Sequence, residues 1–106
     1  MIVVNRFRVP EAEQPAFRDD LERARASLAI QVGYVAGRIG RNVDDPELWV
    51  LTTEWEGPGA YRRALSAYDV KLTAVPTLSR ALDEPSAYER VEPGEPLNIV
   101  GTRSLG

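Results

Sequence analysis

The stretch LWVLTTEWEGPG, residues 48–59, constrains the fold more than any other part of the chain. Trp49, Leu51, Thr53 and Trp55 stand at every second position and share one face, which is the period of a strand whose two faces differ. Gly57-Pro58-Gly59 then ends the strand, because proline has no amide hydrogen to donate to a sheet. A charged segment, residues 60–67, follows directly and is predicted to be a helix. Trp55 is therefore expected at the rim of a sheet, where the chain turns into a helix.

The other periodic segments predict the order strand, helix, strand, strand, helix, strand. Residues 2–9 alternate as a strand, and a helix begins between Glu11 and Pro15, since proline suits a first helical turn. Gly37 and Gly40 indicate a bulge or a close backbone approach in the second strand, residues 34–43. Asp69 is expected to cap a helix that runs to Leu82 with a break at Pro76, before a last strand at residues 86–92. This order predicts an α+β, ferredoxin-like fold with an antiparallel sheet and helices on one face.

The two faces of the predicted sheet differ in what covers them. Val3, Asn5, Phe7 and Val9 share the face of the first strand that lies under the helices, and the third strand adds Trp49, Leu51, Thr53 and Trp55. The helix between the first two strands offers one apolar stripe, which consists of Phe17, Leu21, Ala24 and Leu28. The opposite face has no helix to cover Ile2, Val4, Leu48 and Val50, and a bare apolar face of that size implies a partner. We therefore expect a homodimer, a closed α/β barrel, in which Arg6 and Arg8 meet carboxylates such as Glu54.

The length of 106 residues fits one domain. We expect residues 1–92 to form that domain and residues 93–106 to be a tail that packs on it or across the dimer, because the LNIV segment of the tail is apolar. The net charge of −3, with scattered basic residues, gives no basis for binding nucleic acid. No apolar run is long enough to span a membrane, and the N-terminus does not resemble a signal peptide. A cytoplasmic protein with no membrane partner is the expectation.

The chain contains no histidine and no cysteine. This excludes cysteine nucleophiles, Ser-His-Asp triads, His- or Cys-based zinc sites and His-ligated haem. The acidic pairs Asp19-Asp20 and Asp44-Asp45 lack the spaced ligands of a calcium loop and are interpreted as solvated charge. The sequence thus predicts neither a metal nor a cofactor.

The segments GYVAGRIGR, residues 33–41, and DDPELWVLTTEWEGPGAY, residues 44–61, resemble the antibiotic biosynthesis monooxygenase superfamily of dimeric α+β barrels. The resemblance covers about residues 2–92. In the quinone-forming branch, a Trp at the end of the third strand and a Tyr six residues later line the pocket, with an Asn four residues before the Trp. Trp55 and Tyr61 match this pattern. Leu51 occupies the Asn position, and Asn5 is expected to supply an amide from the first strand instead.

The haem-degrading branch of the superfamily fits less well. Asn5 matches its first-strand Asn, but Ala64 and Thr73 stand at the positions of its Trp and of its iron-binding His. Haem degradation is therefore disfavoured.

The resemblance implies a cofactor-independent monooxygenase that acts on a small aromatic or polyketide-like substrate, an anthrone or a quinol. Catalytic roles would belong to Asn5, Trp55 and Tyr61, whose amide, indole N–H and phenol would stabilise a developing oxyanion. Phe7 and Leu51 are expected to line the site. Arg38 either steers an anionic substrate or forms an ion pair between subunits. Plain structural interpretations stay open for Asn5 and Trp55, and the same fold also suits a non-catalytic dimer that binds a hydrophobic ligand or acts as a scaffold.

Overall fold

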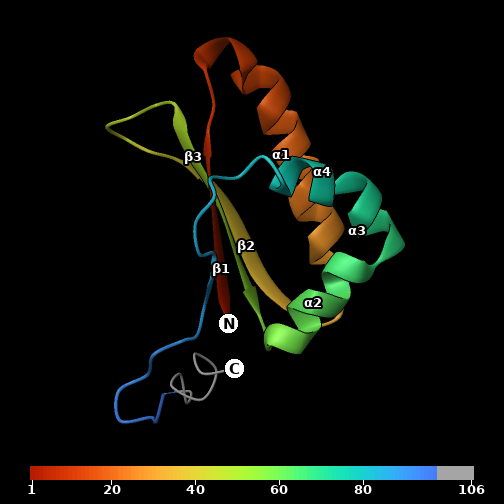
Figure 1. Cartoon of the computed structure of the whole chain (residues 1–106), viewed down its shortest axis with the longest axis vertical. Helices are drawn as coiled ribbons and strands as arrows, with labels where there is room; N and C mark the ends of the chain where they lie inside the picture. The colour runs from red at the N-terminus through yellow and green to blue at the C-terminus, as the bar shows by residue number, and fades with distance from the viewer. Residues whose placement is uncertain (98–106) are drawn as a thin grey trace.

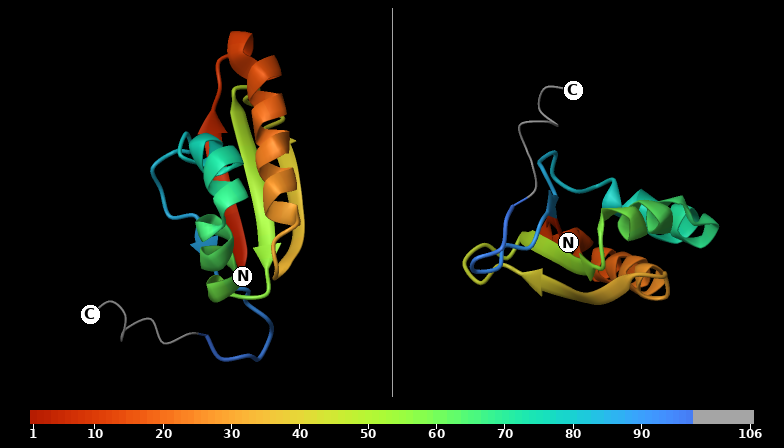
Figure 2. Two further views of the ribbon diagram at one scale, coloured as in Figure 1. Left: turned by 90° about the vertical axis from the view of Figure 1, so that its right-hand side faces the viewer. Right: turned by 90° about the horizontal axis from the view of Figure 1, so that it is seen from below.

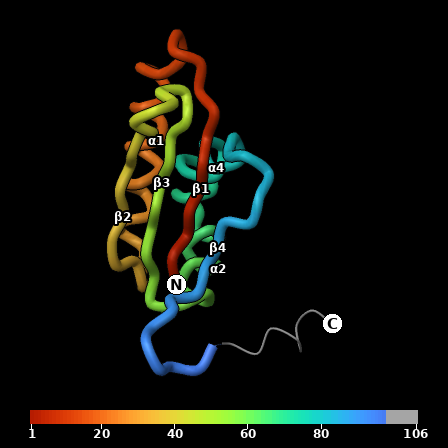
Figure 3. The backbone as a smooth tube through the Cα atoms, turned by 90° about the vertical axis from the view of Figure 1, so that its left-hand side faces the viewer, coloured from red at the N-terminus to blue at the C-terminus, as the bar shows by residue number. Residues whose placement is uncertain are grey.

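The computed structural model describes residues 1–97, and its centre is an antiparallel sheet of order β2-β3-β1-β4. The strands are β1 (Ile2–Arg8), β2 (Tyr34–Arg41), β3 (Leu48–Trp55) and β4 (Ala87–Tyr88). Figure 3 shows them side by side in this order. The predicted α+β ferredoxin-like arrangement is confirmed. β4 has only two residues, so the expected strand over residues 86–92 is too long.

All helices lie on one face of this sheet (Figures 1 and 2). They are the short 3-10 helix η1 (Glu11–Glu13), then α1 (Gln14–Ala29), α2 (Pro58–Ser66), α3 (Tyr68–Thr73) and α4 (Val75–Leu78). The prediction that Asp69 caps a helix to Leu82 is wrong. Asp69 lies inside α3, whose first turn has no side-chain cap, and α4 ends at Leu78. The break falls at Ala74, because Pro76 is accommodated only in the first turn of a new helix.

The core lies between α1 and the covered face of the sheet. The predicted stripe of Phe17, Leu21, Ala24 and Leu28 is buried, as are Val3, Phe7, Trp49, Leu51, Thr53 and Trp55 from the strands. Phe17 contacts both Phe7 and Trp49, at ring-centroid distances of 5.1 and 5.7 Å. The face assignment made from the two-residue period is therefore correct, and it places Asn5 on the covered face between Val3 and Phe7.

The other face of the sheet faces the viewer in Figure 3, and none of the helices formed by residues 1–97 lies on it. Its apolar side chains, Ile2, Val4, Leu48 and Val50, are half-buried. Arg6 and Arg8 do meet carboxylates, but the partners are Glu84, in a two-pronged contact at 2.7 and 2.8 Å, and Asp45 at 3.0 Å. Within the chain, the candidate partner Glu54 does not meet Arg6 or Arg8, because it stands opposite Ile2 at the other end of β1 and pairs with Arg90. A contact with Glu54 of a second subunit stays a prediction. The homodimer stays a prediction.

The end of the chain is only partly described. Residues 93–97 are exposed, and the remainder of the predicted tail, residues 98–106 with most of the LNIV segment, lies outside the described residues. The boundary at residue 92 and the packing of the tail stay predictions. No helix among the described residues combines the length and the hydrophobicity needed to cross a bilayer.

Candidate functional site

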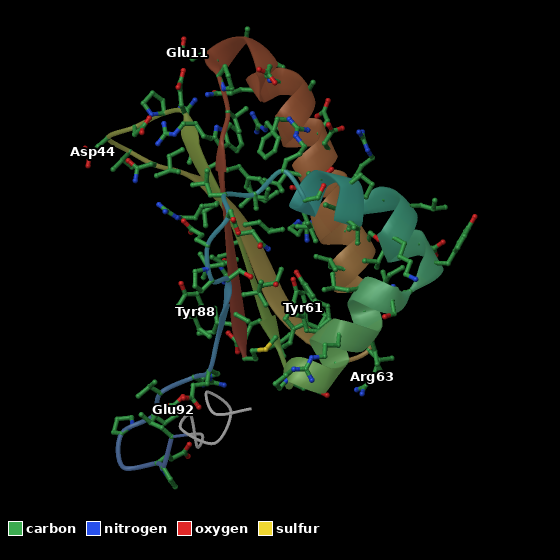
Figure 4. All side chains as sticks on the ribbon, viewed as in Figure 1. Glu11, Asp44, Tyr61, Arg63, Tyr88 and Glu92 are labelled. Carbon is green, nitrogen blue, oxygen red and sulfur yellow. The ribbon has the colours of Figure 1, made fainter. Side chains whose placement is uncertain are left out.

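The structure brings Asn5, Trp55 and Tyr61 together between the sheet and α2. The rings of Trp55 and Tyr61 are 5.4 Å apart between centroids and inclined by 53°. The Asn5 side chain lies near the Tyr61 hydroxyl, and its hydrogen-bonding effect lowers the pKa of that phenol. In Figure 4, Tyr61 points from α2 toward the strands. Asn5 comes 50 residues before Trp55, and Tyr61 comes six residues after it. The three residues nevertheless form one contiguous cluster.

Backbone contacts hold the end of β3 and the start of α2 in place. The N-terminal amine donates to the Trp55 carbonyl at 2.9 Å, and the Trp55 amide donates to the Met1 carbonyl at 2.8 Å. Gly33 has a φ of +92°, and a Cβ on it would lie 2.4 Å from the Cβ of Ala60. Only glycine combines this conformation with so close an approach. The contact seats the first turn of α2 against the start of β2, and Tyr61 is the next residue along that turn.

Asn5 contributes an amide to the cluster and Tyr61 a phenol, and this phenol is neutral. Burial raises the pKa of the Tyr61 hydroxyl above its ordinary value of 10.0, and the hydrogen bond from Asn5 opposes this effect only in part. Tyr61 and Asn5 are both half-buried. At neutral pH, Tyr61 is therefore a hydrogen-bond donor rather than a base.

Trp55 has a different role from the one expected. Its indole N–H donates to the Thr53 hydroxyl at 2.9 Å, and the residue is only 1% exposed. The indole N–H is therefore already engaged and is not a free donor for a developing oxyanion. What Trp55 offers the cluster is an apolar wall, with Tyr61 on one side and Tyr34 packed edge-on at 5.3 Å on another.

The other predicted site residues, Phe7, Leu51 and Arg38, do not belong to the cluster of Asn5, Trp55 and Tyr61. Leu51 stands directly opposite Asn5 across β1 and β3, but it is fully buried in the core. Phe7 is equally buried and packs on Phe17. Arg38 is exposed and stands opposite Thr52, so it lies on the helix-free face. The structure does not bring Arg38 to the predicted pocket, because its position in β2 is out of phase with the covered face.

Two residues of the cluster were missed by the sequence interpretation, Tyr34 and Thr53. The two-residue period places Thr53 on the covered face of the third strand, and no sequence pattern gives Tyr34 a role. A signal for Tyr34 existed in Gly37, where a Cβ would lie 2.2 Å from the Tyr34 hydroxyl. Gly37 is therefore the site of the close approach expected in this strand. The irregularity in the strand register lies elsewhere, between Tyr34 and Ala36. The acceptor role of Thr53 has no comparable signal.

Possible metal ligands are scattered over the described residues. Within residues 1–97, no three Asp or Glu side chains come close enough to hold a metal ion together. The candidate site is therefore built from an amide, a phenol and aromatic walls.

Comparisons with known proteins agree with this fold. The family model for antibiotic biosynthesis monooxygenases matches residues 1–74. The chain is similar to the crystal structure of SnoaB, a cofactor-independent oxygenase from Streptomyces nogalater, with a TM-score of 0.71, 26% identity and coverage of 89% of this chain and 96% of SnoaB. A conserved protein from Methanosarcina mazei gives a TM-score of 0.66 at 19% identity, over 81% of this chain and 84% of that one.

A sequence relative is the 42.8 kDa protein of the whiE locus of Streptomyces coelicolor. It is 32% identical over 59 residues, which make up 56% of this chain and 15% of the relative. The match therefore concerns a small part of that longer protein.

Proposed function

This chain belongs to the antibiotic biosynthesis monooxygenase family, and we propose that it is a cofactor-independent monooxygenase that oxidises a small aromatic or polyketide-like compound, an anthrone or a quinol, with dioxygen. The observation that carries the proposal is the juxtaposition of the Asn5 amide and the Tyr61 hydroxyl beside the Trp55 ring. The similarity to SnoaB over nearly the whole of both chains supports it.

The chemistry needs no redox group on the protein. An anthrone that has lost a proton is an electron-rich enolate, and it passes an electron to dioxygen directly. Recombination forms a C–O bond and gives a hydroperoxide, which loses water. One oxygen atom remains as the new carbonyl, and the other leaves as water with the two hydrogens of the oxidised methylene carbon. The protein has to hold the substrate, stabilise its oxyanion and exclude water.

The cluster offers a group for each of these tasks. The Asn5 amide donates a hydrogen bond to the substrate oxyanion. Tyr61, whose raised pKa keeps it neutral, donates to the peroxide oxygen as negative charge develops there. The Trp55 ring provides a flat apolar wall for an aromatic substrate, with its N–H already satisfied by Thr53. Proton removal is left to the acidity of the substrate itself.

A non-catalytic dimer of the same fold is the second candidate. The observation that favours it is the complete burial of Trp55 and Leu51, since side chains of this chain fill the space directly above the sheet there. In that case the cluster is a scaffold, or it holds a hydrophobic ligand without turnover. In either case we propose a homodimer in the cytoplasm, joined through the half-buried face of Ile2, Val4, Leu48 and Val50.

Measurement of oxygen uptake with an anthrone as the substrate, in the presence of a metal chelator, tests the proposal. The full chain should consume one dioxygen per anthrone, and Asn5→Ala should lower kcat by about 10²–10³-fold, as expected when one oxyanion donor is removed. Asp44→Asn is the matched control, because Asp44 lies in an exposed turn at the far end of the molecule from Tyr61 (Figure 4). Saturable anthrone binding without oxygen uptake would instead support a binding protein, and absence of both would support a scaffold.

A further inference from the structure

A groove of about 920 Å³ lies between α1 and the β2 edge of the sheet, away from the Asn5 cluster. Figure 2 shows α1 running alongside β2. The lining residues on α1 include Pro15, Arg18 and Asp19, and those on the strands include Ile39, Arg41 and Trp49. Its volume falls in the range of small-molecule sites in proteins. Trp49 and Trp55 are six residues apart on β3, so the two regions are separated by roughly 20 Å along the strand.

One end of the groove gathers hydrogen-bond donors. Arg41 and Trp49 are direct cross-strand partners, so their side chains lie next to each other on the covered face. The Arg41 guanidinium donates to the Gln14 side-chain oxygen at 3.2 Å. Gln14 is itself buried and donates to the carbonyls of Val9 and Pro46 at 3.1 and 2.9 Å. A fully bonded buried amide thus holds Arg41 at the groove.

The donor that lacks an acceptor at this end is the Trp49 indole N–H, and Arg41 has Gln14 as its acceptor but no carboxylate partner among the described residues. Trp49 is only 8% exposed, and its indole N–H, which is itself shielded from solvent, has no hydrogen-bond partner among the described residues. Leaving such a group unpaired costs about 1–3 kcal/mol, so a native protein usually provides an acceptor. Within residues 1–97, neither Arg41 nor Arg18 has a carboxylate partner. A guanidinium fork suits a carboxylate, and Trp49 is the direct cross-strand neighbour of Arg41.

The charges further along the groove limit what such a ligand can be. Glu11 from η1 and Asp19 and Glu22 from α1 line the same groove and would repel a second negative charge. Ile39, Pro15 and the Trp49 ring offer apolar surface between the two ends. We propose that this groove is a second ligand site, which binds a small organic monocarboxylate with a flat apolar body through Arg41, Arg18 and the Trp49 indole N–H.

The chain has two tryptophans, which makes the proposal directly measurable. A ¹H–¹⁵N spectrum of the full chain contains two indole N–H signals, and Trp49→Phe assigns them. Titration with 2-naphthoate should move the Trp49 signal downfield in a saturable way as its N–H gains an acceptor. The Trp55 signal should stay in place, because its N–H is bonded to Thr53. 2-Naphthamide, which has the same ring system but no charge, and the dianion 2,6-naphthalenedicarboxylate should bind at least about tenfold more weakly.

Charge-neutralising variants locate the site. Arg41→Gln and the exposed Arg18→Gln should each weaken 2-naphthoate binding by about tenfold or more, as the loss of a charge-assisted hydrogen bond predicts. Arg23→Gln is the control, since Arg23 is on the same helix but pairs with Asp20 outside the groove.

Three results would each overturn the proposal: no saturable shift of the Trp49 signal at millimolar 2-naphthoate, equal affinity for 2-naphthamide, or unchanged binding in Arg18→Gln. A shift of the Trp55 indole signal in place of the Trp49 signal would place the carboxylate at the Asn5 cluster and would also overturn the proposal. Asn5→Ala leaves the Trp49 response intact, so the groove site and the proposed oxygenase activity fail or succeed separately.

Discussion

Asn5 and Leu51 stand directly opposite each other in the antiparallel pair of β1 and β3. Their environments nevertheless differ, because Asn5 is half-buried with its side chain near the Tyr61 hydroxyl, whereas Leu51 is fully buried in the core. An amide at position 5 therefore reaches the cluster surface, and an amide at position 51 would have to satisfy its hydrogen bonds inside the core.

Leu51→Asn should therefore destabilise the protein. We expect a loss of about 2–5 kcal/mol in the free energy of unfolding, from the lost apolar burial and the poorly satisfied amide. Leu51→Met, which conserves volume, should cost less than about 1.5 kcal/mol. Urea unfolding of the three proteins measures this. Similar stability for Leu51→Asn and the parent chain would mean that position 51 is open to solvent or to a ligand.

Tyr61 should make stability depend on pH in the alkaline range. Its pKa is raised in the folded state, so the folded protein holds this proton more tightly than the unfolded chain does. The contribution is fully present below about pH 10, the ordinary tyrosine pKa, and is lost as the pH rises through the higher folded pKa. Urea unfolding from pH 8 to 11 should show a steeper decline for the parent chain than for Tyr61→Phe. Tyr68→Phe, an exposed tyrosine, should behave like the parent.

The pKa of the Tyr61 hydroxyl should depend on Asn5. The Asn5 hydrogen bond lowers the pKa of Tyr61, against the larger effect of burial. Asn5→Ala should therefore raise the Tyr61 pKa further, which a spectrophotometric titration of tyrosinate absorbance, taken as the difference from the corresponding Tyr61→Phe protein, would detect. A lower pKa in Asn5→Ala would show that removing the amide admits water and that solvation outweighs the lost bond.

Thr53 should stabilise the protein through the Trp55 indole. Thr53→Val keeps the shape but removes the acceptor of a buried N–H, at an expected cost of about 1–3 kcal/mol. Thr53→Ser keeps the hydroxyl and should recover most of the hydrogen-bond contribution. Urea unfolding gives the free energies, and the Trp55 indole proton should shift upfield in Thr53→Val. Equal stability of the valine and serine variants would contradict this role.

Gly33 should be required for the seating of α2. Gly33→Ala places a methyl group 2.4 Å from the Cβ of Ala60 and forces alanine to a φ of +92°, at an expected cost of about 2–4 kcal/mol. Gly57→Ala is the matched control, since a Cβ there meets open space and its φ of −177° suits any residue. Thermal unfolding compares the two. Equal melting temperatures would mean that α2 shifts away from β2 at little cost.

The helix-free face should form the proposed homodimer. Val4→Asp puts a charge on that half-buried face and should give a monomer at micromolar concentration in sedimentation velocity. Leu72→Asp, on the exposed side of α3, should leave the dimer intact. A parent chain that sediments as a monomer, or a Val4→Asp variant that still sediments as a dimer, would reject this interface.

The sequence by itself determined the order of elements, the covered face and the core. Period-two alternation in β1 and β3 and the stripe of α1 are local patterns, and burial follows directly from them. The Gly57-Pro58-Gly59 break likewise placed Trp55 at the end of its strand. Only the tertiary structure decided where polar groups find their partners. The engagement of the Trp55 indole by Thr53, the pairing of Arg6 with Glu84, and the placement of Arg38 on the opposite face from Asn5 depend on strand register and on distances between segments far apart in the chain. Hydrogen bonds and ion pairs act over a few ångströms, so their partners are set by that geometry and not by local periodicity.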